Sequence, residues 1–301
     1  MVAPVLAQTK SHLCNLFNID GSTYPATSIT LKDNATQLAI EDITKTTIPT
    51  QHAQNEIPIT LLDGKAIYCV AGTLTKDLVK EAASTGQFII YGSINDADCG
   101  NIKKNMNGAK SIKFINIDGK QVTSLLGILE YSEASSVTFE DCNFSEATTL
   151  HDGFAYMRNL TSFSFKGMGL TKNLTAIKFM FYGCTKLESV DFCDCDCDFS
   201  SVQTLFYMFS HCKALKSIDF SKCNLTSLTE TGGMFYNCSA LESIDFSNRD
   251  LSSVISYEDM FNGCTALKEI KAIGCNEGTI AFLNARLNDA GLKDQVQLIV
   301  E

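Results

Sequence analysis

The chain has 301 residues, a formal net charge of −10 and a mean hydropathy of +0.04. This length allows one large domain or a repeat array with a small appendage. The acidic balance, without a dense cluster of Lys and Arg, argues against nucleic acid as a partner, because such binding depends on neutralising phosphates. No stretch is long and apolar enough to cross a bilayer, so we expect no membrane insertion.

The first sixty residues stand apart in composition. All four prolines of the chain lie there, at Pro4, Pro25, Pro49 and Pro58. The segment is rich in Thr and alternates only weakly between apolar and polar residues, which predicts a β-rich or extended attachment segment over residues 1–60. The first residues have no charged n-region and too short an apolar run for a signal h-region, which leaves two alternatives: the protein is not secreted by the usual route, or a leader has been removed.

A short amphipathic stretch follows. The sequence TKDLVKEAA, from Thr75 to Ala83, predicts a helix with Thr75 as its N-cap and Gly86 just beyond its end. A degraded repeat unit centred on Ile89 and Tyr91 comes next. We interpret residues 61–105 as an N-terminal cap with one helix, because the open end of a repeat array needs a cover.

Residues 106–275 repeat themselves with a period of about 26 residues. Three segments are nearly identical: MFYGCTKLESVDF from Met180, MFSHCKALKSIDF from Met208 and MFYNCSALESIDF from Met234. A fourth, MFNGCTALKEIKA, begins at Met260. When the units are aligned, one apolar position recurs in seven of them, namely Ile112, Val137, Phe163, Val190, Ile218, Ile244 and Ile270.

Each unit predicts one coil of a solenoid. Met, Phe, Cys and Leu at offsets 0, 1, 4 and 7 fit the apolar face of a short helical turn. The next residues alternate, as in Ser217-Ile218-Asp219-Phe220, which indicates a short strand with one buried face. Stacked coils would share a core that one coil cannot form alone. We therefore predict an α/β solenoid with a parallel sheet on one side, short helical turns on the other, and a cap at each end.

The last residues, 276–301, predict the C-terminal cap. Thr279 to Ala290 has the pattern of a helix that Gly291 ends. Gln295 to Val300 alternates like a final strand. A helix and a strand together could cover the apolar end of the last coil.

Most of the thirteen cysteines recur at fixed places in the repeat. One set shares an offset within the predicted helical turn: Cys184, Cys212, Cys238 and Cys264. A second set follows the strand: Cys142, Cys195, Cys223 and Cys275. Metal binding and disulfides are the functional alternatives. Because free Cys is among the most buried residue types, we interpret both sets as small apolar side chains between coils.

The run Cys193-Asp-Cys-Asp-Cys-Asp198 falls in a long unit, whose Met-to-Met step is 28 residues instead of 26. Two of its residues are therefore an insertion that should bulge from a corner of the coil. Cys193, Cys195 and Cys197 could hold a soft or borderline cation. Their spacing is not that of a usual zinc site, and no His lies nearby in sequence, so we favour an acidic bulge without a metal.

The outward side of the predicted strands carries two polar columns. Ser189, Ser217 and Ser243 belong to one column, and Asp191, Asp219 and Asp245 to the next. The functional interpretation is an acidic ligand-binding strip. The alternative, which we favour, is a solvated face that repeat duplication produced, where Ser and Asp keep the exposed side of the strands polar.

The unit Met-Phe-x-x-Cys-x-x-Leu-x-x-Ile-Asp-Phe-Ser resembles the repeat of the BspA-like leucine-rich-repeat bacterial surface proteins. The resemblance is strongest from Met180 to Ala272, and family members read Leu-Asp-Leu-Ser where this chain has Ile218 to Ser221. It implies a leucine-rich-repeat solenoid, secreted or at the cell surface, that binds host or neighbouring macromolecules. It brings no catalytic residues.

The chain has no Gly-rich phosphate loop, no Gly-x-Ser-x-Gly and no His-Glu-x-x-His. Together with a regular repeat, this favours a non-enzymatic binding or adhesion module that needs no cofactor and recognises a protein or a glycan. The alternative is a structural subunit of an assembly, such as a phage virion fibre or decoration protein, with residues 1–60 docked on a partner shell.

Overall fold

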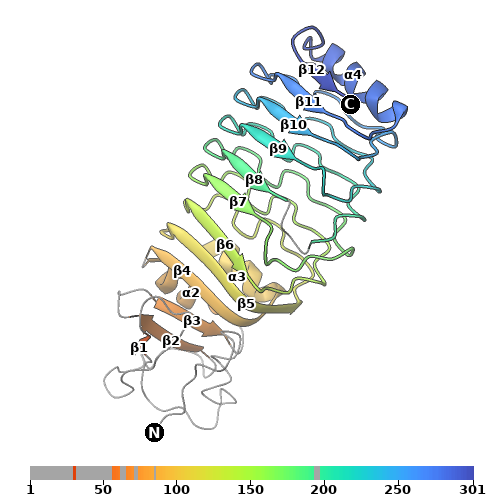
Figure 1. Ribbon diagram of the computed structural model, residues 1–301. Coiled ribbons are helices and arrows are strands. Elements are labelled where there is room, and N and C mark those ends of the chain that lie inside the picture. Colours follow the sequence, from red (N-terminus) through yellow and green to blue (C-terminus); the bar gives the residue numbers. More distant parts are fainter. Residues whose placement is uncertain (1–29, 32–55, 62–65, 71–73, 85, 193–196) are drawn as a thin grey trace.

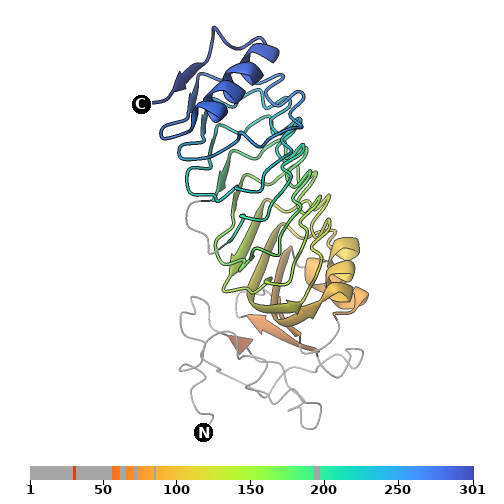
Figure 2. The same cartoon turned by 90° about the vertical axis from the view of Figure 1, so that its right-hand side faces the viewer.

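The computed structural model is an elongated stack of coils with β1 at one end and β12 at the other (Figure 1). Strands run along one side of the stack and turns along the opposite side (Figure 2). The structure describes residues 30–31, 56–61, 66–70, 74–84, 86–192 and 197–301. Most of the expected attachment segment therefore lies outside the described residues.

The first sheet has six strands in the order β1-β2-β3-β4-β5-β6. Strands β2 and β3 pair antiparallel, and all other neighbours in this sheet pair parallel. The parallel stacking of the repeat thus extends toward the N-terminus as far as β3. The strands are β1 Thr30–Leu31, β2 Glu56–Leu61, β3 Ala66–Val70, β4 Gln87–Asn95, β5 Ser111–Gln121 and β6 Ser136–Glu140.

Two helices connect these strands, α2 (Lys76–Ser84) and α3 (Asp96–Asn105). The first lies where the sequence predicts it. The second makes the expectation of one helix in residues 61–105 wrong. Asn95 caps α3, because its side chain accepts the N–H of Asp98, whose carboxylate accepts the N–H of Asn95 in return. The polar sequence of α3 hides its helical period, so only this capping pattern could have indicated it.

Strand β4 is the degraded unit, but it is displaced by one residue from the expected centre. Phe88 pairs with Ile112, and both Phe88 and Ile90 are fully buried. These two residues, rather than Ile89 and Tyr91, therefore occupy the repeat's inward strand positions. A slip of one residue matters because it exchanges the two faces of a strand.

The remaining strands are short and parallel. Strand β7 pairs with β8, and a second sheet has the order β12-β11-β10-β9. Ile218 pairs with Ile244 and Ile244 with Ile270, and Phe163 pairs with Val190, which confirms the aligned apolar column. The strands are β7 Ser162–Ser164, β8 Ser189–Asp191, β9 Ser217–Asp219, β10 Ser243–Asp245, β11 Glu269–Lys271 and β12 Gln297–Ile299.

The side opposite the strands consists of successive turns. The expected short helical turns are wrong, because no helix forms in the described part of the units between β6 and β11. In one unit the N–H groups of Tyr207, Phe209 and His211 donate to the next coil, whereas those of Met208 and Ser210 donate to carbonyls three residues back. Alternate amides thus join neighbouring coils, which a helix could not do because it uses its N–H groups internally.

Two residues of each unit, four positions apart, have a positive φ that an α-helix does not allow. In the unit just described they are Tyr207 (φ 53°) and His211 (φ 63°). The equivalent pairs are Gly127 and Tyr131, Asp152 and Tyr156, Phe179 and Gly183, Gly233 and Asn237, and Asp259 and Gly263. The apolar residues at the helix-like offsets still point into the core, but from a chain of turns.

The core contains rows of stacked Phe rings. The centroid of Phe209 lies 5.6 Å from that of Phe181 and 5.7 Å from that of Phe235, with interplanar angles of 7° and 5°. Phe220 and Phe246 stack in the same way at 5.5 Å. All five rings are fully buried. Coil stacking places identical side chains one above another, and such ring pairs contribute about 0.5–1.5 kcal/mol each beyond their buried area.

The C-terminal end of the stack is covered by α4 (Glu277–Asp289) and β12. Asn276 caps α4, so the helix begins two residues before the expected Thr279, and Gly291 (φ 70°) follows its end as predicted. Arg286 fixes α4 to the last coil, because its guanidinium carbon lies 3.6 Å from the centroid of the Tyr257 ring.

Candidate binding groove on the strand face

The strand face is interrupted twice, between β6 and β7 and between β8 and β9. At the first gap the facing edges of two sheets are not paired as strands. Backbone hydrogen bonds close this gap at both ends: the N–H of Thr161 donates to Ser135 O (3.4 Å), and that of Cys142 to Gly167 O (2.7 Å). The opening between β6 and β7 is therefore a slit rather than a channel.

Phe163 lies beside the gap between β6 and β7 and is the exception in its column. The other six units of the aligned column carry Ile or Val at this position. The Phe163 ring lies 6.1 Å from that of Phe139, 4.5 Å from that of Phe154 and 5.0 Å from that of Phe181. A side chain larger than its place in a packed core shifts the adjacent backbone. We infer that this ring holds β7 away from β6.

A groove with a volume of about 610 Å³ opens at this gap. That volume lies within the range of small-ligand sites, about 300–1,000 Å³. Core side chains of β6 and β7 form its floor, and hydroxyl and charged groups surround it. The lining residues are Val137, Thr138, Phe139, Glu140, Asp141, Ser162, Phe163, Ser164, Lys166, Gly167, Ser189 and Asp191.

The charged groups of the groove are unbalanced. Glu140, Asp141 and Asp191 supply three carboxylates, and Lys166 supplies one ammonium group. Lys113 on β5 also approaches Glu140, with 3.8 Å between Nζ and Oε1. All of these side chains are at least partly exposed, so water and salt screen their charges. The lining is formally negative and rich in hydrogen-bond acceptors.

The structure brings two of the six predicted strip residues, Ser189 and Asp191, into this groove. The other four lie outside it on β9 and β10. Asp219 and Asp245 pair directly, and each Oδ1 accepts the backbone N–H two residues further on, at 2.7 and 2.8 Å. Such Asx turns shape the chain after a strand. This structural role is not apparent from the spacing of the residues in sequence, and ligand binding by the whole strip stays a prediction.

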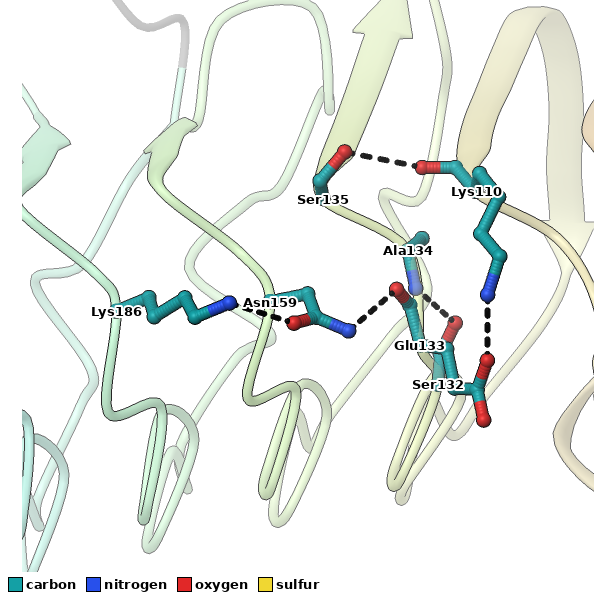
Figure 3. Close-up of polar contacts among 7 residues, drawn as sticks. All are labelled: Lys110, Ser132, Glu133, Ala134, Ser135, Asn159 and Lys186. Carbon is teal, nitrogen blue, oxygen red and sulfur yellow. Dashed lines mark hydrogen bonds and ion pairs between the residues drawn. The ribbon is translucent and has the colours of Figure 1, made fainter.

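One flank of the strand face is held by polar contacts from coil to coil (Figure 3). Lys186 Nζ donates to Asn159 Oδ1 (3.1 Å), and Asn159 Nδ2 donates to Glu133 O (3.2 Å). Lys110 Nζ lies 2.6 Å from Glu133 Oε2. Farther along the stack this flank carries two more ion pairs of 2.6 Å, Lys216–Glu188 and Lys268–Glu242. Exposed pairs contribute only about 0.2–1 kcal/mol each, so none of them dominates stability.

The buried cysteines form a ladder of their own. Cys212 Sγ donates to Phe181 O of the preceding coil at 3.1 Å, and Cys184, Cys238 and Cys264 make the equivalent bond at 3.0–3.1 Å. Burial raises the pKa of the Cys184 and Cys264 thiols to about 12 and those of Cys212 and Cys238 well above their ordinary value. These thiols are neutral donors inside the core, as expected of small buried side chains.

Described members of the second cysteine column make similar bonds. Cys142 and Cys275 each donate to a Phe carbonyl of the preceding coil, at 3.4 and 3.2 Å. In the long unit Cys197 makes such a bond, to Phe165 O at 3.5 Å, and the assignment of Cys195 to the column stays a prediction. Cys193 and Cys195 lie outside the described residues. Within the described ranges, no three His, Cys, Asp or Glu side chains gather in a group that could hold a metal ion.

We expect the ladder thiols to resist alkylation in the folded protein. The thiolate is the reactive species, and the raised pKa values keep Cys184, Cys212, Cys238 and Cys264 protonated at mildly alkaline pH. Iodoacetamide treatment followed by peptide mass spectrometry should leave these four unmodified, whereas the denatured chain should be alkylated at all thirteen cysteines. Rapid modification of the native ladder would contradict this expectation.

Aromatic side chains also line the turn side, a feature that sequence analysis did not single out. Tyr131, 62% exposed, stacks on Tyr156 at 4.7 Å, and Phe179 stacks on Tyr207 at 5.5 Å. All four have positive φ, at places where other units carry Gly, Asn or Asp. Bulky residues are strained in this conformation, and stacking between coils offsets part of the strain.

No helix in the described residues is long and apolar enough to cross a membrane. No curated protein matches the chain. Among solved structures, a leucine rich cell surface protein from Faecalibacterium prausnitzii A2-165 is 13% identical, with a TM-score of 0.32; the match covers 78% of this chain and 98% of that chain. Residues 150–272, the most regular part of the array, are similar to the family described as Mycoplasma protein of unknown function, DUF285.

Proposed function

We propose that the protein is a non-enzymatic binding or adhesion module and that its strand-face groove receives the ligand, a part of a protein or of a glycan. The groove carries this proposal. It opens beside Phe163, where the repeat departs from its Ile and Val pattern, at one of the two interruptions of a polar strand face. Proteins tend to break their own structural pattern at functional sites, because the function requires an arrangement that costs some stability.

The chemistry of the lining supports binding rather than catalysis. It offers hydroxyl and carboxylate groups, but neither His nor Cys stands among the lining residues to activate a nucleophile. The proposed module needs no cofactor. The resemblance of the repeat to BspA-like leucine-rich-repeat proteins supports a location at the cell surface or outside the cell.

Filling the groove tests the proposal. Ser162 on β7 and Ser217 on β9 are equivalent in the repeat and both exposed, but only Ser162 lines the groove. A ligand is first found on glycan and protein arrays with the full chain. Ser162→Tyr is then expected to weaken its binding by about tenfold or more, a loss of about 1.4 kcal/mol. Ser217→Tyr should leave the affinity unchanged, and equal binding by both variants would contradict the proposal.

The same ligand tests the acidic strip. Asp191, Asp219 and Asp245 can each be changed to Asn, which keeps the carbonyl oxygen that an Asx turn needs. If the groove alone binds, only Asp191→Asn weakens binding. Weaker binding in all three variants would instead support recognition by the whole strip.

A further inference from the structure

The shape of the groove restricts what can enter it. An added β-strand needs about 4.8 Å of separation from each neighbouring strand. The hydrogen bonds from Thr161 to Ser135 and from Cys142 to Gly167 hold the two coils together at either end of the slit. A peptide backbone therefore cannot insert along the slit without breaking both. A side chain or a small group that enters from the front meets no such obstacle.

The charged side chains of the groove are mostly acceptors. The carboxylates of Glu140, Asp141 and Asp191 only accept when ionised, whereas the strand edges that face the slit offer both N–H donors and C=O acceptors. Hydroxyl groups of Ser162 and Ser164 can also accept. A ligand group with several donors, no acceptor and a positive charge matches this set.

We propose that the groove binds an arginine side chain of a partner protein. This inference rests on the proposed function and narrows it to a protein with an exposed basic segment. A guanidinium group has five N–H donors in a plane and a permanent positive charge, so it suits a groove whose lining carries several carboxylates. Its apolar stem suits a floor of Val137 and Phe163.

A neutral sugar fits the same groove less well. Sugar rings bind by stacking on the open face of an aromatic ring. Phe139 and Phe163, the aromatic residues of the floor, are only 6% and 3% exposed, so neither offers an open face. The formal charge of the lining, three carboxylates against the ammonium group of Lys166, adds attraction for a cation and none for a neutral glycan.

Nuclear magnetic resonance of the full chain can test this with simple probes. The probes are the blocked peptide Gly-Gly-Arg-Gly-Gly, its counterpart with Gln in place of Arg, and the neutral sugar cellotetraose. The Arg peptide should shift the backbone amide signals of Ser162, Ser164 and Ser189 and lose affinity as salt is added. The Gln peptide and the sugar should leave those signals in place.

Two variants supply a matched charge control. Asp191→Asn, inside the groove, is expected to weaken binding of the Arg peptide about fivefold, which is the upper end for one exposed ion pair. Asp245→Asn removes the same charge from the same strand face outside the groove and should have no effect. Equal affinities of the two variants, or Arg-peptide shifts centred on β9 and β10, would overturn the inference.

The outcomes also separate this inference from the proposed function. If cellotetraose shifts the groove signals and the Arg peptide does not, the groove is a glycan site; the arginine inference then fails and the proposed function stands. If a ligand from the arrays binds equally well to Ser162→Tyr, the proposed function fails at its own test. Equal affinity for the Arg and Gln peptides would show that the positive charge of the arginine does not contribute to binding. That result would overturn the arginine inference but not the proposed function.

Discussion

Replacing Phe209 with Ala is expected to lower the free energy of unfolding by about 3–5 kcal/mol. The Phe209 ring is fully buried and stacks on Phe181 and Phe235, at 5.6 and 5.7 Å. Its removal leaves a cavity between the rings of the two neighbouring coils and ends two ring stacks at once. Urea denaturation followed by circular dichroism gives the change, from the transition midpoint and slope.

The matched control is Ser217→Ala, on the exposed side of the neighbouring strand, which should change stability by less than about 0.5 kcal/mol. Each coil contacts mainly its neighbours, so a cavity in the middle of the stack uncouples the coils on its two sides. We therefore also expect a shallower or biphasic transition for Phe209→Ala. A single transition with unchanged midpoint would contradict the stacked core.

The strand side of the stack could be predicted from sequence because two signals coincide there. The repeat period aligns equivalent residues, and the alternation around Ile218 or Ile244 separates the buried side of each strand from the exposed side. In a parallel stack, residues at equivalent positions of neighbouring repeat units pair with each other in adjacent strands, as Ile218 and Ile244 do. Where the unit is degraded, at β4, the alternation alone was ambiguous and the prediction slipped by one residue.

The turn side could not be predicted from apolar spacing. Met208, Phe209, Cys212 and Leu215 all point inward, and a helix would place them on one face as well. The distinguishing signal lay in the residues between them. Gly, Asn or Asp recurs in many units where φ is positive, and such residues tolerate this conformation better than others. One unit lacks this signal, because Tyr207 and His211 stand at its two positions of positive φ.

The groove could not be predicted from the regular part of the repeat, because it lies at a unit with an exceptional residue. A column of Ser and Asp was visible in the sequence, but its regularity suggested one continuous strip. Phe163 stands among Ile and Val residues in its column, and its ring packs at the place where the sheet opens. Sequence alone did not tell whether that ring would be absorbed by the core or would separate the strands, since this depends on Phe139, Phe154 and Phe181 around it.

Changing Gly167 to Ala should be more harmful than changing Gly291 to Ala, although both glycines have positive φ (75° and 70°). A Cβ on Gly291 would meet nothing within 4 Å, so only the conformational penalty of about 1–2 kcal/mol applies. A Cβ on Gly167 would lie 2.6 Å from Phe139 O, which adds an overpacking term of about 1–3 kcal/mol and gives about 2–5 kcal/mol in total.

The Gly167→Ala variant also tests the groove. Gly167 lines the groove, and its carbonyl oxygen accepts the hydrogen bond that closes one end of the slit. Denaturation midpoints measure the first effect, and amide exchange at Cys142, whose N–H makes that bond, measures the second. Equal losses in the two variants would show that the coils at the groove can separate without resistance.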